Sequence, residues 1–289
     1  MPITIIMFPG QGSQHKGMGE DLFKEFPEDV ETANRVLGYN IVELCLADAD
    51  NKLILTNYTQ PALFFVNYLK YKKYLQTNSQ PDYFIGHSLG EFNALNAAGV
   101  FNFETGLKIV QKRGELMFSV KGTSMAAIIG AEQAHIERIL NDKFPEIDIA
   151  NINSKLQIVI SGTTEILEKA ADYFEEEGLV YFPLKVSGAF HSRYMTPVKQ
   201  EFESFIKSMP LSNLNVPVVA NFLADIYPNE KDGIIECMVN QIDNPIKWLQ
   251  SVEYLMRMGE CNFIEIGAGD VLTNIIKKIK SQNALENKL

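Results

Sequence analysis

Hydrophobic positions along the chain fall into two patterns, short continuous runs and longer stretches in which apolar residues recur every three or four positions. Short continuous runs are typical of buried strands, and the longer spacing is typical of amphipathic helices. The first two runs, residues 3–8 and 83–85, therefore predict strands. The longer stretches predict two or three short helices within 20–46, a long helix over 62–74 with Pro61 in its first turn, and helices over about 91–98 and 104–118.

The pattern changes to shorter units between residues 123 and 187. It predicts strands over 125–129, 147–151, 156–161 and 180–186, and helices over 132–140 and 165–176. The order is βαββαβ, which is the ferredoxin-like arrangement of a small four-stranded sheet with two helices. We expect residues 123–187 to form a small subdomain inserted in a larger domain.

Alternation of strands with longer helices returns after the insert. It predicts a helix over 195–209, a strand over 216–220, helices over 233–241 and 246–258, a strand over 263–266 and a last helix to about 280. Such alternation on both sides of the insert is typical of one α/β domain with a mostly parallel sheet. We expect residues 1–122 and 188–289 to form that domain, with a polar, frayed tail over 281–289.

Composition and charge narrow the class of protein. The 289 residues are 46% hydrophobic, which suffices for a real core, and no apolar run approaches the roughly 20 residues that a membrane span needs. The net charge of −10 argues against nucleic acid as a partner. An odd number of widely spaced cysteines favours reduced thiols over disulfides or a zinc site, so we expect a cytoplasmic protein without a metal; the cysteines are Cys45, Cys237 and Cys261.

A serine lies in the turn between the second predicted strand and the helix after it. The sequence is Gly86-His87-Ser88-Leu89-Gly90, a G-x-S-x-G pattern whose sharp turn exposes a serine hydroxyl at a helix N-terminus. Five letters are a weak signal, because a glycine-flanked turn with a serine N-cap has the same form. The strand before and the helix after are the context that the pattern requires. We therefore interpret Ser88 as a nucleophile.

A serine nucleophile needs a base, and the chain has four histidines. His135 falls on a predicted small-subdomain helix, and His15 lies in the glycine-rich first loop, where it would line an entrance. His87 adjoins the serine and points to the opposite side, which suits packing or substrate contact. His191 lies between the insert and the returning helix, and a domain junction is a natural cleft. We favour His191 as the base, the alternative being an ordinary hydrogen-bonded loop histidine.

Two other interpretations of these motifs fit less well. An α/β-hydrolase places its base histidine late in the chain, and no histidine follows His191. The glycines of the first loop lack the spacings of nucleotide-binding motifs. That loop follows a strand, as Ser88 does, so it can supply one backbone N–H to a tetrahedral oxyanion, with Leu89 N–H as the second donor.

Seven segments, taken in order, resemble malonyl-CoA:acyl-carrier-protein transacylases, and most closely the free-standing acyltransferases that serve polyketide synthases. The likeness covers essentially the whole chain. It implies an α/β-hydrolase-like core with a ferredoxin-like insert. The segments are Phe8-Pro9-Gly10-Gln11-Gly12-Ser13-Gln14, Thr59-Gln60-Pro61-Ala62-Leu63, Gly86-His87-Ser88-Leu89-Gly90-Glu91, Lys112-Arg113-Gly114, Gly188-Ala189-Phe190-His191-Ser192, Asn244-Pro245 and Glu265-Ile266-Gly267.

The resemblance implies roles for the residues that carry out the chemistry. Ser88 would be the nucleophile and His191 the base, with the backbone N–H groups of Gln11 and Leu89 as oxyanion donors. The main-chain carbonyl at Gln241 would orient the histidine. A carbonyl in that role would explain why no triad aspartate stands out in the sequence.

The resemblance also implies the substrate. Arg113 would pair with a free carboxylate, Phe190 would wall the pocket beside the malonyl C2, and His87 would contact the substrate. The expected reaction is malonyl transfer from malonyl-CoA to the phosphopantetheine thiol of an acyl carrier protein, by a ping-pong mechanism through malonyl-Ser88, serving polyketide or fatty acid synthesis. Coenzyme A would enter as the substrate thioester, and we expect no bound cofactor and a monomer.

Two further functions remain as alternatives. One is an editing hydrolase that removes acyl groups from carrier proteins, and the other is an inactive module that only docks carriers. Arg113 favours a dicarboxylic acyl group, because a buried guanidinium without a carboxylate is costly. Retention of Ser88, His191 and Gln11 beside Arg113 disfavours the inactive module.

The expected carrier is acidic, and so is this chain, so docking must use cations close to the cleft. Arg193, two residues after the proposed base, is the first candidate. The others lie on the final helix, where an ordinary solvated face is the alternative interpretation; they are Lys277, Lys278 and Lys280.

Overall fold

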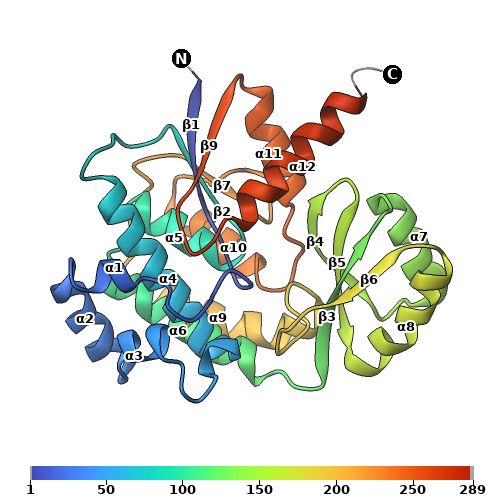
Figure 1. Ribbon diagram of the computed structural model, residues 1–289, viewed down its shortest axis with the longest axis horizontal. Helices are drawn as coiled ribbons and strands as arrows, with labels where there is room; N and C mark the ends of the chain where they lie inside the picture. The colour runs from blue at the N-terminus through green and yellow to red at the C-terminus, as the bar shows by residue number, and fades with distance from the viewer. Residues whose placement is uncertain (1, 287–289) are drawn as a thin grey trace.

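The structure is a computed structural model that describes residues 2–286. Two sheets organise those residues (Figure 1). The larger has five strands in the order β8-β7-β2-β1-β9, and the smaller has four in the order β4-β5-β3-β6. The chain is thus an α/β protein with a mostly parallel sheet and a second, antiparallel sheet.

The larger sheet is parallel except at one edge. Its parallel strands are β1 (Ile3–Phe8), β2 (Tyr83–Gly86), β7 (Val218–Ala220) and β9 (Cys261–Glu265), and β8 (Asp225–Ile226) pairs antiparallel with β7. The two-residue β8 was not predicted, because so short a strand leaves no periodic pattern in the sequence.

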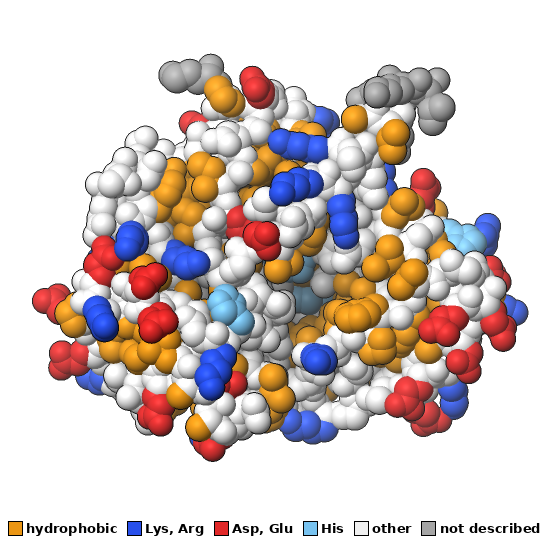
Figure 2. All heavy atoms as spheres, in the orientation of Figure 1, with side chains coloured by type: hydrophobic (Ala, Val, Ile, Leu, Met, Phe, Trp, Pro, Cys, Tyr) orange, Lys and Arg blue, Asp and Glu red, His pale blue; other side chains and the backbone are white. Residues whose placement is uncertain are grey.

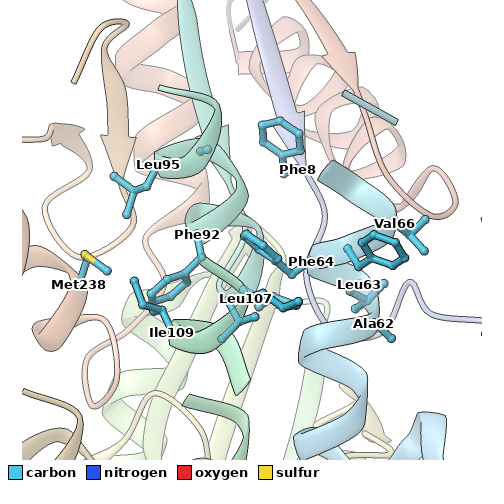
Figure 3. Close-up of a cluster of buried hydrophobic side chains, with 14 of the residues drawn as sticks. Phe8, Ala62, Leu63, Phe64, Val66, Phe92, Leu95, Leu107, Ile109 and Met238 are labelled. Atoms are coloured by element: carbon cyan, nitrogen blue, oxygen red, sulfur yellow. The ribbon is translucent and has the colours of Figure 1, made fainter. Parts of the chain in front are cut away.

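Helices bury both faces of this sheet, and for this reason its central strands consist of continuous runs of apolar residues. Ile6 and Phe8 pack on one face, and Ile5 and Met7 pack on the other. Figure 3 shows Phe8 among the side chains of the first face. The first face is covered by α4 (Thr56–Tyr74), α5 (Leu89–Ala97) and α6 (Phe103–Ser119), and the second by α11 (Trp248–Arg257) and α12 (Val271–Glu286).

The smaller sheet follows the predicted βαββαβ order. Its strands are β3 (Thr123–Ile129), β4 (Asp148–Ser154), β5 (Gln157–Thr163) and β6 (Val180–Pro183), and its helices are α7 (Gln133–Lys143) and α8 (Thr164–Glu176). β6 ends three residues before the predicted boundary. In Figure 1 this unit lies beside the larger sheet, with α7 and α8 on its outer side.

The remaining helices are short or lie close to their predicted positions. Three short helices occupy the region predicted for two or three, and two more follow the insert. They are α1 (Glu20–Phe23), α2 (Pro27–Leu37), α3 (Ile41–Leu46), α9 (Thr196–Lys207) and α10 (Lys231–Asn240), with 3₁₀ turns at Lys52–Ile54 and Arg193–Met195.

Two helix boundaries were predicted wrongly. α4 begins at Thr56, so Pro61 lies inside the helix and not in its first turn. A proline there removes one backbone hydrogen bond, and burial of the surrounding turns outweighs that loss. α12 continues through Glu286 instead of ending near residue 280, and Gln282 in this extension accepts a hydrogen bond from the backbone N–H of Lys155 at 3.3 Å. The rest of the predicted frayed tail, 287–289, lies outside the described residues.

Among residues 2–286, no helix combines the length and the apolar character that crossing a membrane requires. The three cysteines are free thiols: Cys45 and Cys237 are buried and Cys261 is partly exposed.

Candidate active site

The turn that carries Ser88 is tight because glycines bring three backbone segments together. A Cβ on Gly90 would lie 1.9 Å from the carbonyl oxygen of Phe8, and a Cβ on Gly86 would lie 2.0 Å from the backbone of Gly90. Only glycine allows β1, β2 and the start of α5 to approach this closely. Ser88 itself has φ 51° and ψ −107°, a backbone conformation that residues other than glycine rarely adopt.

Ser88 and His191 form a hydrogen-bonded pair. Ser88 Oγ lies 2.8 Å from His191 Nε2, and His191 Nδ1 lies 2.7 Å from the carbonyl oxygen of Gln241. A carbonyl can only accept, so Nδ1 carries the hydrogen and Nε2 is left to accept the serine proton. Burial, assisted by the charge of Arg113, lowers the pKa of His191 to about 3. The imidazole is therefore neutral at physiological pH, the state that a general base requires.

Arg113 places a buried cation beside this pair. Its side chain is 1% exposed, and Nη2 donates to Gln241 Oε1 at 2.8 Å and to Ser88 Oγ at 3.3 Å. Nη1 donates to Gln60 Oε1 at 2.8 Å. Burial lowers the pKa of the guanidinium to about 9, so it remains charged at neutral pH. No described carboxylate forms an ion pair with Arg113, and its Nε has no hydrogen-bond partner.

The first loop lies against the start of α5. A Cβ on Gly10 would lie 2.3 Å from the carbonyl oxygen of His87 and 3.5 Å from the nitrogen of Leu89. This contact places Gln11, the next residue, beside the Ser88 turn. The side chain of Gln11 donates to Thr56 Oγ1 at 3.2 Å, which turns it toward α4.

His87 and Phe190 lie next to the pair with partners of their own. His87 Nε2 is 2.9 Å from Asn153 Oδ1 on β4, and its ring centroid is 5.4 Å from that of Trp248. Phe190 is 5% exposed, and its carbonyl accepts a hydrogen bond from Ser161 Oγ at 2.8 Å. These contacts tie the residues before Ser88 and His191 to the smaller sheet.

The other two histidines lie apart from the pair. His15 is exposed, with Nδ1 3.2 Å from the carbonyl oxygen of Ser13. His135 lies on α7, with Nδ1 2.8 Å from Arg138 Nη2. Neither forms a contact with Ser88 or His191.

Arg193, the first candidate for docking an acidic carrier, pairs with a carboxylate of this chain. Asp148, at the start of β4, accepts hydrogen bonds from its Nε at 2.9 Å and from its backbone N–H at 2.8 Å. The guanidinium is 58% exposed, and its charge is already paired. A cavity of about 650 Å³ opens here between the two sheets, lined by Asp148, His191 and Arg193 among other residues. On the face drawn in Figure 2, a hollow lies between the two parts of the molecule.

Three residues of the site were missed by the sequence analysis. Asn221 follows β7 and bonds to the Ser88 backbone, Glu91 lies in the first turn of α5, and Tyr227 bonds to Glu91. All three are almost fully buried. Glu91 offered a signal, because it is the one charged residue of the helix directly after the serine motif. Asn221 and Tyr227 offered none.

Comparison with known proteins places this geometry in context. The acyl transferase domain family matches residues 5–288. A polyketide biosynthesis malonyl CoA-acyl carrier protein transacylase, BaeC of Bacillus velezensis, is 48% identical over 280 residues, which are 96% of each chain. The crystal structure of a malonyl CoA-acyl carrier protein transacylase from Burkholderia pseudomallei has a TM-score of 0.94 at 42% identity, covering 98% of this chain and 99% of that one.

A further solved structure contains a carrier. It is a type II PKS acyl-carrier protein in complex with its malonyl-transacylase. The matched chain has a TM-score of 0.91 at 32% identity, covering 96% of this chain and 93% of that one.

Proposed function

This chain belongs to the acyl transferase domain family, and from that membership we propose that it transfers malonyl groups from malonyl-CoA to the phosphopantetheine thiol of an acyl carrier protein. The names of its relatives support both the donor and the acceptor. The observation that carries the choice of malonyl is Arg113, a buried cation within 3.3 Å of Ser88 Oγ that lacks a carboxylate partner among the described residues.

The first half-reaction loads the serine. Ser88 Oγ attacks the thioester carbonyl while His191 Nε2 takes its proton, and the oxyanion forms beside the backbone N–H groups of Gln11 and Leu89. The C–S bond then breaks, and the coenzyme A sulfur leaves with the proton from His191. Arg113 holds the free carboxylate in a charge-assisted pair and so fixes the carbonyl over Ser88.

The second half-reaction reverses these steps with a different thiol. His191 removes the proton of the carrier's phosphopantetheine thiol, the sulfur attacks the malonyl ester, and Ser88 leaves with that proton. A single base therefore serves both directions, provided that it is neutral at the start of each one. The low pKa of His191 supplies that condition.

Intact-mass measurement tests the proposal. Mixing the protein with malonyl-CoA should add one malonyl group, and the Ser88→Ala variant should gain none because the turn has no second nucleophile. Adding holo carrier protein should then move the group from the enzyme to the carrier. Release as free malonate at the same rate with and without carrier would instead support the editing hydrolase and contradict transfer.

The finer assignments belong to the same proposal. The strand order β4-β5-β3-β6 and the βαββαβ order support a ferredoxin-like subdomain over 123–187, inserted in an α/β-hydrolase-like domain built from 1–122 and 188–289. We further propose a monomer that serves polyketide synthesis, with coenzyme A bound only as substrate. Its three free thiols support a reducing, cytoplasmic setting.

A further inference from the structure

Three buried residues form a hydrogen-bond network behind the Ser88 turn. Asn221 follows β7, Glu91 belongs to the first turn of α5, and Tyr227 follows β8. Their exposed fractions are 0%, 1% and 2%, so no solvent reaches the network to replace a lost partner. A buried polar group without a partner is costly, which makes each of these bonds consequential.

The side-chain amide of Asn221 spans the turn. Its Oδ1 accepts the backbone N–H of Ser88 at 2.8 Å, and its Nδ2 donates to the carbonyl of Gly86 at 2.7 Å. β2 and β7 pair through Ile85 and Val219, just before this point. The amide thus continues the ladder of peptide hydrogen bonds past the residue where the β2 backbone leaves strand geometry.

Glu91 holds Asn221 in that place. Its Oε2 accepts the backbone N–H of Asn221 at 2.6 Å, and its Oε1 accepts the hydroxyl of Tyr227. Glu91 lies on α5, the helix that directly follows Ser88. The network therefore links the helix after the Ser88 turn to Asn221, which bonds to the turn itself. The positive-φ backbone of Ser88 is therefore fixed from both sides.

We propose that Asn221 is a positioning residue: its amide holds Ser88 in the strained conformation that aims Oγ at His191, and Glu91 holds Asn221. The inference rests on the proposed role of Ser88 as the nucleophile. It assigns Asn221 no contact with the substrate. Loss of the amide should therefore slow attack by Ser88 and leave the affinity for malonyl-CoA unchanged.

The Asn221→Asp variant separates positioning from general stability. An ionised aspartate still accepts from Ser88 N–H, but it cannot donate to the carbonyl of Gly86. A protonated aspartate restores both bonds. Burial and the nearby carboxylate of Glu91 both favour the protonated form, so activity should return as pH falls. A merely destabilising substitution predicts no such recovery.

Other ionisable groups surround this position. Glu91 and Tyr227 bond within the network, Cys237 lies nearby on α10, and Arg113 and His191 lie on the side of Ser88. His191 stays neutral over pH 6–8, since its pKa is lowered to about 3. Burial raises the pKa of Glu91 to about 7, but a protonated Glu91 still accepts the Asn221 N–H through its carbonyl oxygen, so the wild type should show little change over that range.

The experiment uses a fluorophosphonate probe alongside malonyl-CoA. In labelling, Ser88 Oγ bonds to phosphorus, fluoride leaves and His191 takes the serine proton, so the rate reports alignment without requiring a malonyl group. At pH 8, Asn221→Asp should react about 10–100-fold more slowly than wild type with both reagents, recover at least about tenfold by pH 6, and keep the wild-type dissociation constant for malonyl-CoA. Thermal melting at each pH confirms that the protein is folded in the assay.

Asn93→Asp is the matched control. Asn93 is also buried on α5, but it bonds to Phe64 and Asn67 and not to the Ser88 turn. This variant should lose stability without an acid-dependent recovery of labelling. Labelling of Asn221→Asp at the wild-type rate at pH 8, or equal recovery in both variants, would overturn the inference. A wild type that the probe labels and malonyl-CoA does not would instead count against the proposed function alone.

Discussion

At the scale of single residues, burial sets the charge states on which the proposed reaction depends. His191 is 3% exposed and Arg113 is 1% exposed, and burial destabilises the charged form of each. The resulting charge states differ because the ordinary pKa of an imidazole is far lower than that of a guanidinium. The pKa of the imidazole falls far below 7, so it is neutral, whereas the pKa of the guanidinium falls only to about 9, so it remains a cation.

The pH dependence of acylation should reflect the low pKa of His191. A lowered pKa means that the free base persists to lower pH, so the rate of self-acylation by malonyl-CoA should hold from pH 8 through 6.5 to about 5. Rapid quenching followed by intact-mass analysis measures that rate, with circular dichroism as the check on folding. Half-loss of activity near pH 6.5, the ordinary imidazole value, would contradict the prediction.

Removal of the Arg113 guanidinium should affect malonyl and acetyl groups differently. Arg113→Ala should lose roughly 2–5 kcal/mol of transition-state stabilisation toward malonyl-CoA and far less toward acetyl-CoA, which has no carboxylate to pair. Acylation rates with the two thioesters give the comparison. Lys112→Ala is the control, because this neighbouring cation pairs with Glu201. Equal losses for both substrates would refute the pairing.

Selectivity at the malonyl C2 is the prediction for Phe190. Phe190→Ser should relax the preference for malonyl over methylmalonyl without inverting it, since one methyl group is worth only about 1–3 kcal/mol in an apolar pocket. A competition between the two thioesters, read by the mass of the acyl-enzyme, measures the ratio. A wild type that prefers methylmalonyl-CoA would overturn the pocket assignment.

At the scale of elements, the contact between the first loop and α5 determines where the proposed oxyanion donors lie. Gly10→Ala would set a Cβ 2.3 Å from the His87 carbonyl and push the loop, with Gln11, away from the turn. We expect a loss of about 10²-fold in the acylation rate, the cost of one oxyanion donor. Gly17→Ala is the control for backbone strain without a clash, because Gly17 lies in the same segment with a φ of 92° and open space around it. Unchanged acylation in Gly10→Ala would exclude this loop as a donor.

The sequence predicted elements well where a local pattern defines them. The strand, turn and helix around Ser88 and the βαββαβ order of the insert both rest on local periodicity. It failed where distant residues decide the outcome. Pro61 suggested a helix start that packing overrides. The sequence analysis did not predict the pair of Arg193 with Asp148, 45 positions away, or the bond of Asn221 to Ser88, 133 positions away. Contacts between residues so far apart in the sequence produce no local pattern from which they could be predicted.

At the scale of the whole molecule, the distribution of charge determines how an acidic carrier can approach an acidic enzyme. The net charge is −10, so docking has to rely on a local group of cations. Figure 2 shows Lys and Arg side chains over the region of α12, above the hollow between the two parts of the molecule. Lys277 and Lys278 are exposed there and form no ion pair with any residue in 2–286, whereas Lys280 lies over the ring of Phe263.

Charge reversal on α12 should therefore separate docking from chemistry. The Lys277→Glu and Lys278→Glu double variant should lower the rate of transfer to the carrier, with the salt dependence that is typical of exposed charges, and leave self-acylation by malonyl-CoA unchanged. Transfer from the pre-formed malonyl-enzyme is measured at several salt concentrations. Arg193→Glu is the contrasting variant: because Arg193 pairs with Asp148 beside the His191 loop, it should slow self-acylation itself. If instead Arg193→Glu slowed only the carrier-dependent step and the α12 variant had no effect, the carrier would dock at Arg193 and not on α12.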